Sequence, residues 1–303
     1  MKPATSTTHG VTEDGLAYED GSLTLRDGRE LAWRWWGEEG GRPVLKLQGT
    51  PGSRLFRNYN PQVQLGLGVR YLMADRPGYG GSTRKPGRGI ADFADDLVEL
   101  LDAHGLDRVP VMGTSGGGPH TLAIAAQHPD RISAATVVVG AVPLEPDEVS
   151  HLVGANALSY AASEKGWDAL HEFLVGLRER ILGSEGMQGV LADAPAEDRA
   201  IMGSVAWQKI SRVSTAEALK QGAEGWADEG MAMHKRWDFN PETVKASVTW
   251  WHSADDKNVP LSAGRRGASR LREVDFRVWR NEGHFASLVH DKEIVQELLD
   301  RST

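Results

Sequence analysis

Cysteine is absent from the 303-residue chain, and this absence excludes disulfide bridges and thiolate metal sites. It gives no support to an oxidising compartment, although it does not exclude export. No apolar run approaches the roughly 20 residues needed to span a bilayer, and residues 1–9 lack the apolar core of a signal peptide. We therefore expect a cytoplasmic protein without a membrane partner.

Basic residues are also fewer than acidic ones: 34 Lys and Arg stand against 42 Asp and Glu, for a formal net charge of -8. The basic residues form no cluster, which argues against nucleic-acid binding. The sequence also lacks a glycine-rich phosphate loop, a paired-histidine metal motif and an internal repeat. We therefore expect a small-molecule substrate, no cofactor and no metal, while the oligomeric state stays open.

The most informative segment is residues 113–117, which read Gly-Thr-Ser-Gly-Gly. An apolar run precedes it, and a predicted helix over residues 119–128 follows. A strand, a sharp turn and a helix in this order place Ser115 at the apex of a strained turn and aim the amide of Gly116 at the same space. Such a string also arises by chance in ordinary turns, but the flanking strand and helix favour a nucleophilic serine.

A serine nucleophile needs a base that takes its proton and a carboxylate that orients the base. Among the later histidines, His284 follows the predicted strand over residues 275–279 and comes directly after a glycine. His290 falls at the start of a predicted terminal helix, where a solvated histidine is expected. Two neighbouring acids, Asp255 and Asp256, lie in the loop after an apolar strand.

The order of these pieces resembles the α/β-hydrolase superfamily, in which serine, acid and histidine follow one another along the chain. Residues 253–260 are similar to the superfamily's glycine-x-x-aspartate-x-x-valine-proline segment, with Asp256 at the acid position. The resemblance implies a triad of Ser115, Asp256 and His284. It points to a capped, bacterial serine hydrolase or esterase-like subgroup.

Residues 48–54, Gln-Gly-Thr-Pro-Gly-Ser-Arg, resemble the superfamily's loop after the third strand. In acyl transfer, backbone amides aimed at the developing oxyanion contribute about 2.7–4 kcal/mol each. The resemblance implies that Thr50 and Gly116 supply these amides, with Gln48 and Gly49 adjacent to the site. Gln48 replaces the usual histidine, and glutamine can also donate and accept hydrogen bonds. The alternative interpretation of this stretch is an ordinary Pro-Gly turn.

Residues 75–82, Asp-Arg-Pro-Gly-Tyr-Gly-Gly-Ser, resemble the superfamily's loop after the fourth strand. The resemblance implies a structural role, in which Asp75 and Arg76 tie loops together beneath the site. We expect no catalytic role for this loop.

Alternating strand and helix patterns predict an α/β fold with a mostly parallel central sheet and helices on both faces. A hairpin is expected around Asp27-Gly28, and a buried strand over residues 132–142. Residues 1–20 are predicted to form a flexible tail. The core of the predicted α/β-hydrolase fold comprises residues 21–142 and 242–303.

Between residues 143 and 241 the pattern changes, because no convincing strand appears. Helical spacing is found over residues 167–181, and another helix is predicted over residues 216–233. The resemblance identifies the block as an inserted helical cap, and residues 221–226 look like the cap end of a bacterial hydrolase subgroup. Most of its tryptophans and methionines are expected to pack the cap onto the core, and a minority to line a pocket.

These observations predict a serine hydrolase that cleaves a carboxylic ester of a small apolar molecule through a covalent acyl-enzyme. The same triad also fits cofactor-free haloperoxidase-type perhydrolysis, C–C bond hydrolysis, or a biosynthetic acyl-transfer or cyclisation step. A third class is a hydrolase-like ligand-binding protein with little turnover, which the unusual Gln48 keeps open. One superfold hosts many reactions, so the fold alone does not select among them.

Overall fold

In the computed structural model, which describes residues 7–302, nine strands form a single sheet. The strands are β1 (Thr8–Val11), β2 (Ala17–Thr24), β3 (Glu30–Trp36), β4 (Arg42–Leu47), β5 (Val69–Ala74), β6 (Val109–Thr114), β7 (Ile132–Val138), β8 (Ser247–Ser253) and β9 (Asp275–Trp279). Their order in the sheet is β1-β2-β3-β5-β4-β6-β7-β8-β9.

The sheet is parallel from β5 to β9, while β1, β2 and β3 pair antiparallel at one side. The prediction of a mostly parallel sheet is therefore confirmed. Parallel strands bring their carboxyl ends to one edge, which is where open α/β sheets bind ligands. The loops after β4, β6, β8 and β9, which carry the predicted site residues, all leave this edge.

The prediction of a flexible tail over residues 1–20 is wrong for residues 8–20. Strand β1 pairs antiparallel with β2, with Thr8 opposite Asp20 and Val11 opposite Ala17. The tail resembled a loose segment because its residues are polar and largely exposed. The backbone hydrogen bonds of the ladder nevertheless extend the sheet by one strand. Residues 1–6 lie outside the described part of the chain.

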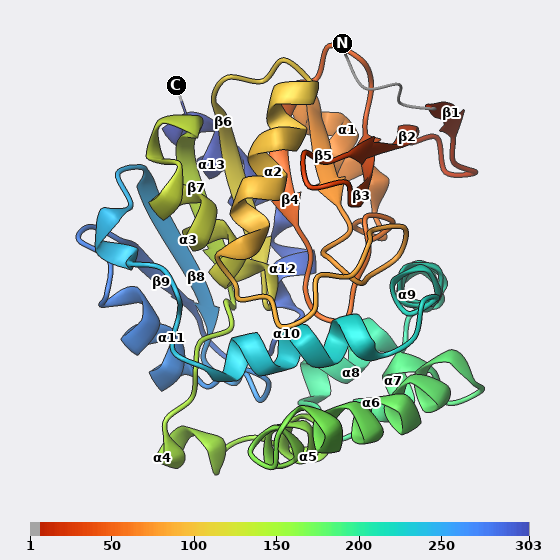
Figure 1. The fold of residues 1–303 in the computed structure, drawn as a ribbon, viewed down its shortest axis with the longest axis vertical. Helices are drawn as coiled ribbons and strands as arrows, with labels where there is room; N and C mark the ends of the chain where they lie inside the picture. The colour runs from red at the N-terminus through yellow and green to blue at the C-terminus, as the bar shows by residue number, and fades with distance from the viewer. Residues whose placement is uncertain (1–6, 303) are drawn as a thin grey trace.

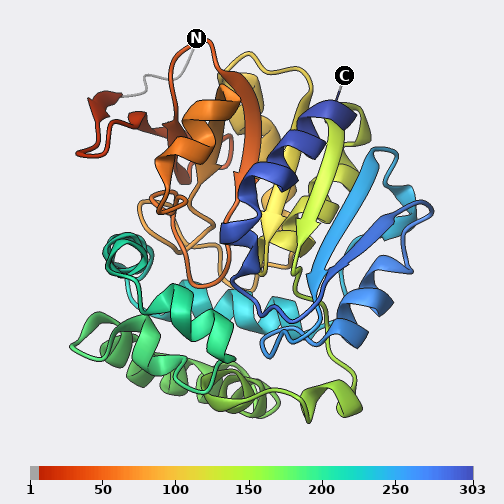
Figure 2. The same cartoon turned by 180° about the vertical axis from the view of Figure 1, so that it is seen from behind.

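Helices cover both faces of the sheet, as Figures 1 and 2 show from opposite sides. One face carries α2 (Asp92–Ala103), α3 (Gly117–Gln127) and α11 (Leu261–Ala268). The other carries α1 (Pro61–Leu67) and α13 (Asp291–Arg301), with the short α12 (Ala286–Val289) before it. No described helix is both long enough and apolar enough to cross a membrane.

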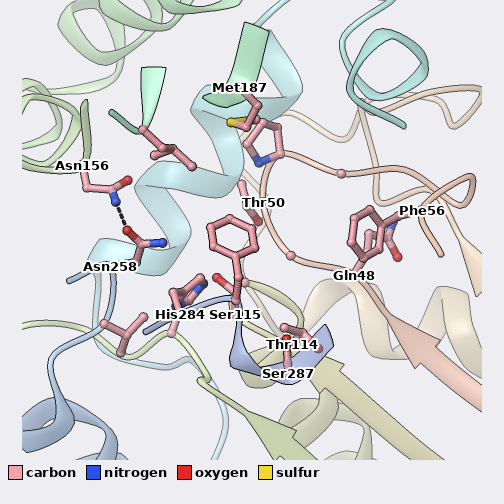
Figure 3. Close-up of a pocket in the computed structure, with 18 of the residues that line it drawn as sticks. Gln48, Thr50, Phe56, Thr114, Ser115, Asn156, Met187, Asn258, His284 and Ser287 are labelled. Atoms are coloured by element: carbon pink, nitrogen blue, oxygen red, sulfur yellow. Dashed lines mark hydrogen bonds between the residues drawn. The ribbon is translucent and has the colours of Figure 1, made fainter. Parts of the chain in front are cut away.

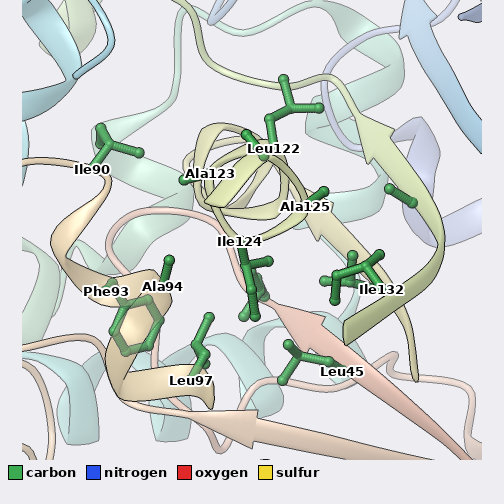
Figure 4. Close-up of a cluster of buried hydrophobic side chains, with 14 of the residues drawn as sticks. Leu45, Ile90, Phe93, Ala94, Leu97, Leu122, Ala123, Ile124, Ala125 and Ile132 are labelled. Carbon is green, nitrogen blue, oxygen red and sulfur yellow. The ribbon is translucent and has the colours of Figure 1, made fainter. Parts of the chain in front are cut away.

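The larger buried cluster fills the space between α2, α3 and the sheet (Figure 4). Leu45 of β4 packs there with Phe93 and Leu97 of α2 and Ile124 of α3. Val44, the neighbour of Leu45, belongs to the cluster on the opposite face, because successive side chains of a strand point to opposite faces. A sheet that is apolar on both faces holds the loops at its carboxyl edge in fixed positions.

A layer of helices lies beyond that edge of the sheet (Figures 1 and 2). It comprises α4 (Pro146–Val149), α5 (Gly154–Ser163), α6 (Trp167–Leu182), α7 (Gly186–Val190), α8 (Ala196–Met202), α9 (Val205–Ala218) and α10 (Glu224–His234). All of residues 143–241 are described, and they contain no strand. The helices are joined by their own apolar cluster, which includes Leu170, Leu174 and Trp226 and also takes in Tyr79 from the core.

Two predicted elements differ from the structure in their bounds. The strand expected over residues 132–142 ends at Val138, because Val139 has a φ of 44° and turns the chain out of the sheet. The helix expected over residues 216–233 is two helices, α9 and α10. Gly222, with a φ of 121°, lies in the break between them.

Candidate active site

Ser115 lies at the sharp turn between β6 and α3. Its φ of 53° is in the left-handed region, which is rare for residues other than glycine. A Cβ atom on Gly113 would lie 2.3 Å from the carbonyl oxygen of Gly117, and one on Gly117 would lie 2.2 Å from that of Leu47. Because both contacts are with backbone, only glycine fits on either side of the serine.

His284 and Asp256 form a hydrogen bond of 2.8 Å between Nδ1 and Oδ2. The second carboxylate oxygen of Asp256 accepts from the amides of Asn258 at 2.8 Å and Val259 at 2.9 Å. Asp255, the neighbouring acid in the sequence, is exposed. The acid that reaches the histidine is therefore the one that the resemblance to the superfamily motif selected.

Burial and the neighbouring charges shift the pKa values of Asp256 and His284 in opposite directions. Burial disfavours the ionised form of Asp256, but the adjacent His284 outweighs it and lowers the pKa of the carboxyl. Burial likewise disfavours the imidazolium of His284, but nearby carboxylates outweigh it and raise the pKa of the ring above 6.5. His284 is thus a stronger base than a free histidine.

Ser115 and His284 line the same pocket of about 290 Å³ between the core and the helical layer (Figure 3). The wall on the side of the helical layer is mostly apolar and includes Leu177, Ile181, Met187, Val190, Leu191 and Trp207. Among the polar contacts between that layer and the core, the side-chain amide of Asn156 donates to the side-chain oxygen of Asn258 at 2.7 Å, and both residues line the pocket.

The loop after β4 lies directly against Ser115. A Cβ atom on Gly49 would lie 3.3 Å from the Cβ of Ser115. A Cβ atom on Gly116 would lie only 2.1 Å from Oγ1 of Thr50. Thr50 and Gly116, the residues predicted to supply two amides, are therefore in contact beside the serine.

Gln48 is buried and organises its own loop. Its Nε2 donates to the carbonyl of Ala74 at 3.0 Å. Arg76 donates to two carbonyls of the same loop, that of Gln48 at 2.6 Å and that of Gly49 at 2.9 Å. Glutamine therefore fixes the loop to the end of β5 by a hydrogen bond that its amide can make.

The loop over residues 75–82 is hydrogen-bonded to the loop after β4, which agrees with the structural role that the resemblance implied. Asp75 accepts from the amide of Arg54 at 2.6 Å and from its guanidinium at 2.5 Å. Burial raises the pKa of the Asp75 carboxyl even though Arg54 lowers it. Neither Asp75 nor Arg76 lines the pocket in the described part of the chain.

Two carboxylates of the helical layer reach the same loops, and no sequence motif pointed to either. Glu229 of α10 accepts from Oγ1 of Thr50 at 3.0 Å. Asp198 of α8 accepts from the amides of His284 at 2.9 Å and Phe285 at 2.8 Å. Both acids lie on helices with ordinary helical spacing, so their positions emerge only from the tertiary structure.

The lysine that lines the pocket is paired with a carboxylate, and the other late histidine lies outside the described lining. Lys46 is the only lysine or arginine among the described lining residues, and its Nζ lies 3.4 Å from Oδ1 of Asp291. His290, the other late histidine, is half-buried and hydrogen-bonds Glu282 at 2.9 Å. Across residues 7–302, no group of three or more His, Asp or Glu side chains is arranged to hold a metal ion.

A model of the alpha/beta hydrolase fold family matches residues 42–291. The match covers most of the chain, so the protein belongs to this family. The resemblance that the sequence motifs indicated is thereby confirmed.

Related proteins carry the names of hydrolases. A putative carbamate hydrolase, RutD, from Caulobacter vibrioides is 30% identical, and the match covers 95% of each chain. A 2-hydroxy-6-oxo-2,4-heptadienoate hydrolase from Pseudomonas putida is 23% identical and is matched over 88% of its length and 86% of this chain. A thermophilic esterase from Thermogutta terrifontis has a similar solved structure, with a TM-score of 0.66, 20% identity and coverage of 93% of this chain and 98% of that one. The comparisons support hydrolase activity.

Proposed function

We propose that the protein is a serine hydrolase that cleaves an uncharged carboxylic ester of a small, apolar molecule. The observation that carries the proposal is the hydrogen bond of 2.8 Å between His284 and Asp256, in the pocket that also holds the elbow residue Ser115. A nucleophile, a base and an acid that orients the base are the parts that acyl transfer through serine requires.

Each residue has one role in this mechanism. Asp256 accepts from Nδ1 of His284, so Nε2 is the ring atom left to take the proton of Ser115. The serine oxygen attacks the ester carbonyl carbon, and the amides of Thr50 and Gly116 stabilise the oxyanion. His284 then protonates the leaving alcohol. A water molecule, deprotonated by His284, releases the carboxylic acid from the acyl-enzyme.

The pocket supports a small and uncharged substrate. Its volume of about 290 Å³ is just below the roughly 300–1,000 Å³ typical of ligand pockets. The lining is largely apolar, and the only lysine among its described residues, Lys46, is already paired with Asp291. A substrate carboxylate, such as that of a dienoate, would therefore be buried without a free cationic partner. This argues against C–C hydrolysis of such an acid.

A carbamate is the second candidate substrate. The relative named as a putative carbamate hydrolase is 30% identical over nearly the whole chain. The paired side-chain amides of Asn156 and Asn258 line the pocket, and they offer donors and acceptors for a carbamate nitrogen. The triad would attack the carbonyl of either substrate in the same way.

A panel of p-nitrophenyl esters with acyl chains of graded length tests the proposal, with a p-nitrophenyl carbamate as one further member. We expect turnover of the short and medium esters. Turnover of the carbamate with none of the esters would favour the second candidate. Binding of esters or products without any turnover would favour a ligand-binding protein.

The helical layer is expected to set the length of the acyl chain. Ala155 of α5 lines the pocket, so Ala155→Phe should lower kcat/KM for the long esters by about tenfold or more relative to the acetate. The matched control is Ala157→Phe on the same helix, because Ala157 is similarly half-buried but is not among the described lining residues. An equal change in both variants, or in all esters, would contradict a pocket wall at Ala155.

The pH dependence of kcat/KM should reflect the titration of His284. Burial disfavours the imidazolium, but the carboxylates of Asp256 and Asp198 together outweigh it and raise the pKa of the ring above 6.5. The mechanism needs the neutral ring, so kcat/KM should fall as the pH falls through a value above 6.5. The measurement is kcat/KM for p-nitrophenyl acetate across pH 5–9. An acid limb with its midpoint below 6.5 would remove His284 as the base.

A further inference from the structure

We infer that two carboxylates of the cap, the helical layer of residues 143–241, are positioning residues for the catalytic loops of the core. Glu229 holds the loop that carries Thr50, and Asp198 holds the loop that carries His284. The inference rests on the proposed function. In this view the cap helps to orient the groups that carry out the chemical step, in addition to limiting the size of the substrate.

Glu229 is a fully buried carboxylate whose two oxygens are both engaged. Oε1 faces three basic side chains, and Oε2 accepts from two hydroxyl groups. The partners of Oε1 are Nε of Arg76 at 2.5 Å, Nε2 of His120 at 3.1 Å and Nη2 of Arg88 at 3.4 Å; those of Oε2 are Tyr79 at 2.7 Å and Thr50 at 3.0 Å. Arginine charges lower the pKa of the carboxyl well below 4.5 although burial opposes this, so it is ionised near neutral pH.

The contacts lead from Glu229 to the backbone of the loop by two routes. The direct route is the hydroxyl of Thr50, whose own amide is one of the two proposed for the oxyanion. The indirect route runs through Arg76, which Glu229 holds and which donates to the carbonyls of Gln48 and Gly49. Three consecutive residues of the loop are thus oriented from a helix of the cap.

Asp198 acts on the loop at the other side of the pocket. Its two oxygens accept from the amides of His284 at 2.9 Å and Phe285 at 2.8 Å. A Cβ atom on Gly283 would lie 2.3 Å from Oδ2 of Asp198, so the glycine before the histidine gives the carboxylate room to approach. The imidazole is therefore held by Asp256 at its ring and by Asp198 at its backbone.

The inference predicts a loss in kcat for Glu229→Gln, of about tenfold or more, with KM changed by less than about threefold. The reason is that the oxyanion amides act on the transition state and not on the bound ester. The matched control is Asp228→Asn, one residue away on α10. Asp228 is also buried and pairs with Arg84 at 2.7 Å, but its described contacts do not reach the loop. We expect the control to keep kcat within about twofold.

A second pair of variants keeps the Glu229 carboxylate beside the buried arginines, in case Glu229→Gln fails to fold. Oγ1 of Thr50 also accepts from Nη2 of Arg76 at 3.0 Å, but that nitrogen keeps its bond to the carbonyl of Gly49. Thr50→Val keeps the shape of the side chain and removes only its hydroxyl, so kcat should fall by about fivefold to tenfold. Thr50→Ser, which restores a hydroxyl, should recover most of the rate. If Thr50→Val has the rate of the wild type, or if Asp228→Asn loses as much as Glu229→Gln, the role of Glu229 is overturned.

Asp198→Asn has a readout that a loss of stability does not produce. The carboxylates that face His284 are Asp256 and Asp198, and Nε2 of His252 lies 3.9 Å from Oδ2 of Asp256. Removing one negative charge disfavours the imidazolium, so the acid limb of kcat/KM should move to lower pH while kcat falls. Glu197→Gln, at the exposed neighbouring position, should leave both unchanged. An unshifted limb in Asp198→Asn overturns its role.

Failure of the inference can be told apart from failure of the proposed function. The reference is wild-type ester turnover that disappears in Ser115→Ala, together with thermal melting of every variant. If that turnover is present and the cap variants match their controls, the inference alone is wrong. If the wild type turns over no ester and no carbamate, the proposed function is wrong and the inference falls with it.

Discussion

Ser115→Ala is expected to lower ester turnover by about 10³-fold or more. In the proposed mechanism the serine hydroxyl forms the covalent bond to the acyl group, and alanine has no atom that can replace it. The substitution removes one oxygen from a half-buried side chain and keeps the Cβ atom, so the turn and its amides should be preserved. Initial rates on p-nitrophenyl acetate, with circular dichroism to verify the fold, measure the effect.

A fluorophosphonate probe gives an independent test of the same residue. The wild type should be labelled at Ser115, and the Ser115→Ala variant should not be labelled at all. Equal labelling of the two proteins would show that another residue is the nucleophile. Full turnover in the variant would mean that the pocket at the elbow is not where esters are cleaved.

Asp256→Asn should also be severely damaging, with kcat lowered by about 10³-fold to 10⁴-fold. Asparagine fits the same space, but its amide can donate to the ring and so favours the wrong tautomer of His284. Asp255→Asn is the matched control on the adjacent residue. Asp255 is exposed, so its loss should change kcat by less than about twofold.

The comparison of these two variants tests which of the two neighbouring acids orients His284. The hydrogen bond of 2.8 Å from His284 to Asp256 requires the damage to fall on Asp256. A larger loss from Asp255→Asn would contradict the geometry of residues 253–260. Both kcat values should be measured above the pKa of His284, so that protonation of the ring does not mask the difference.

The candidate triad could be predicted from the sequence because each member lies in a local pattern. Ser115 has a glycine on each side of a strand-to-helix turn, and His284 follows a glycine after the last strand. Asp256 was separated from Asp255 only by resemblance to a motif, since both residues follow the same strand. Patterns of this kind are fixed by backbone geometry over a few residues, which is why they are visible in one sequence.

The carboxylates of the cap could not be predicted in this way. Glu229 reaches Thr50 across 179 positions of sequence, and Asp198 reaches His284 across 86. Each lies on a helix, where an acidic residue is usually solvated. Burial of such a group becomes apparent only when the cap is packed on the core, and one sequence contains no local signal for that packing.

The fold shows the same division between local and distant information. Parallel strands such as β6 and β7 are visible as apolar runs, because both of their faces are buried. Strand β1 was missed since its four residues are mostly exposed and it is defined by its pairing with β2 alone. The break between α9 and α10 was missed because their helical spacing continues almost without interruption.

The left-handed backbone at Ser115 has a consequence for attempts to make this protein more heat-resistant. A residue other than glycine at a φ of 53° costs of order 1–3 kcal/mol of folding free energy, and glycine would relieve most of that strain. Selection for thermostability alone would thus favour glycine at position 115, and the proposed mechanism predicts that such a protein is more stable but inactive. Any directed-evolution campaign on this scaffold must therefore score turnover and melting temperature together, or hold residues 113–117 constant.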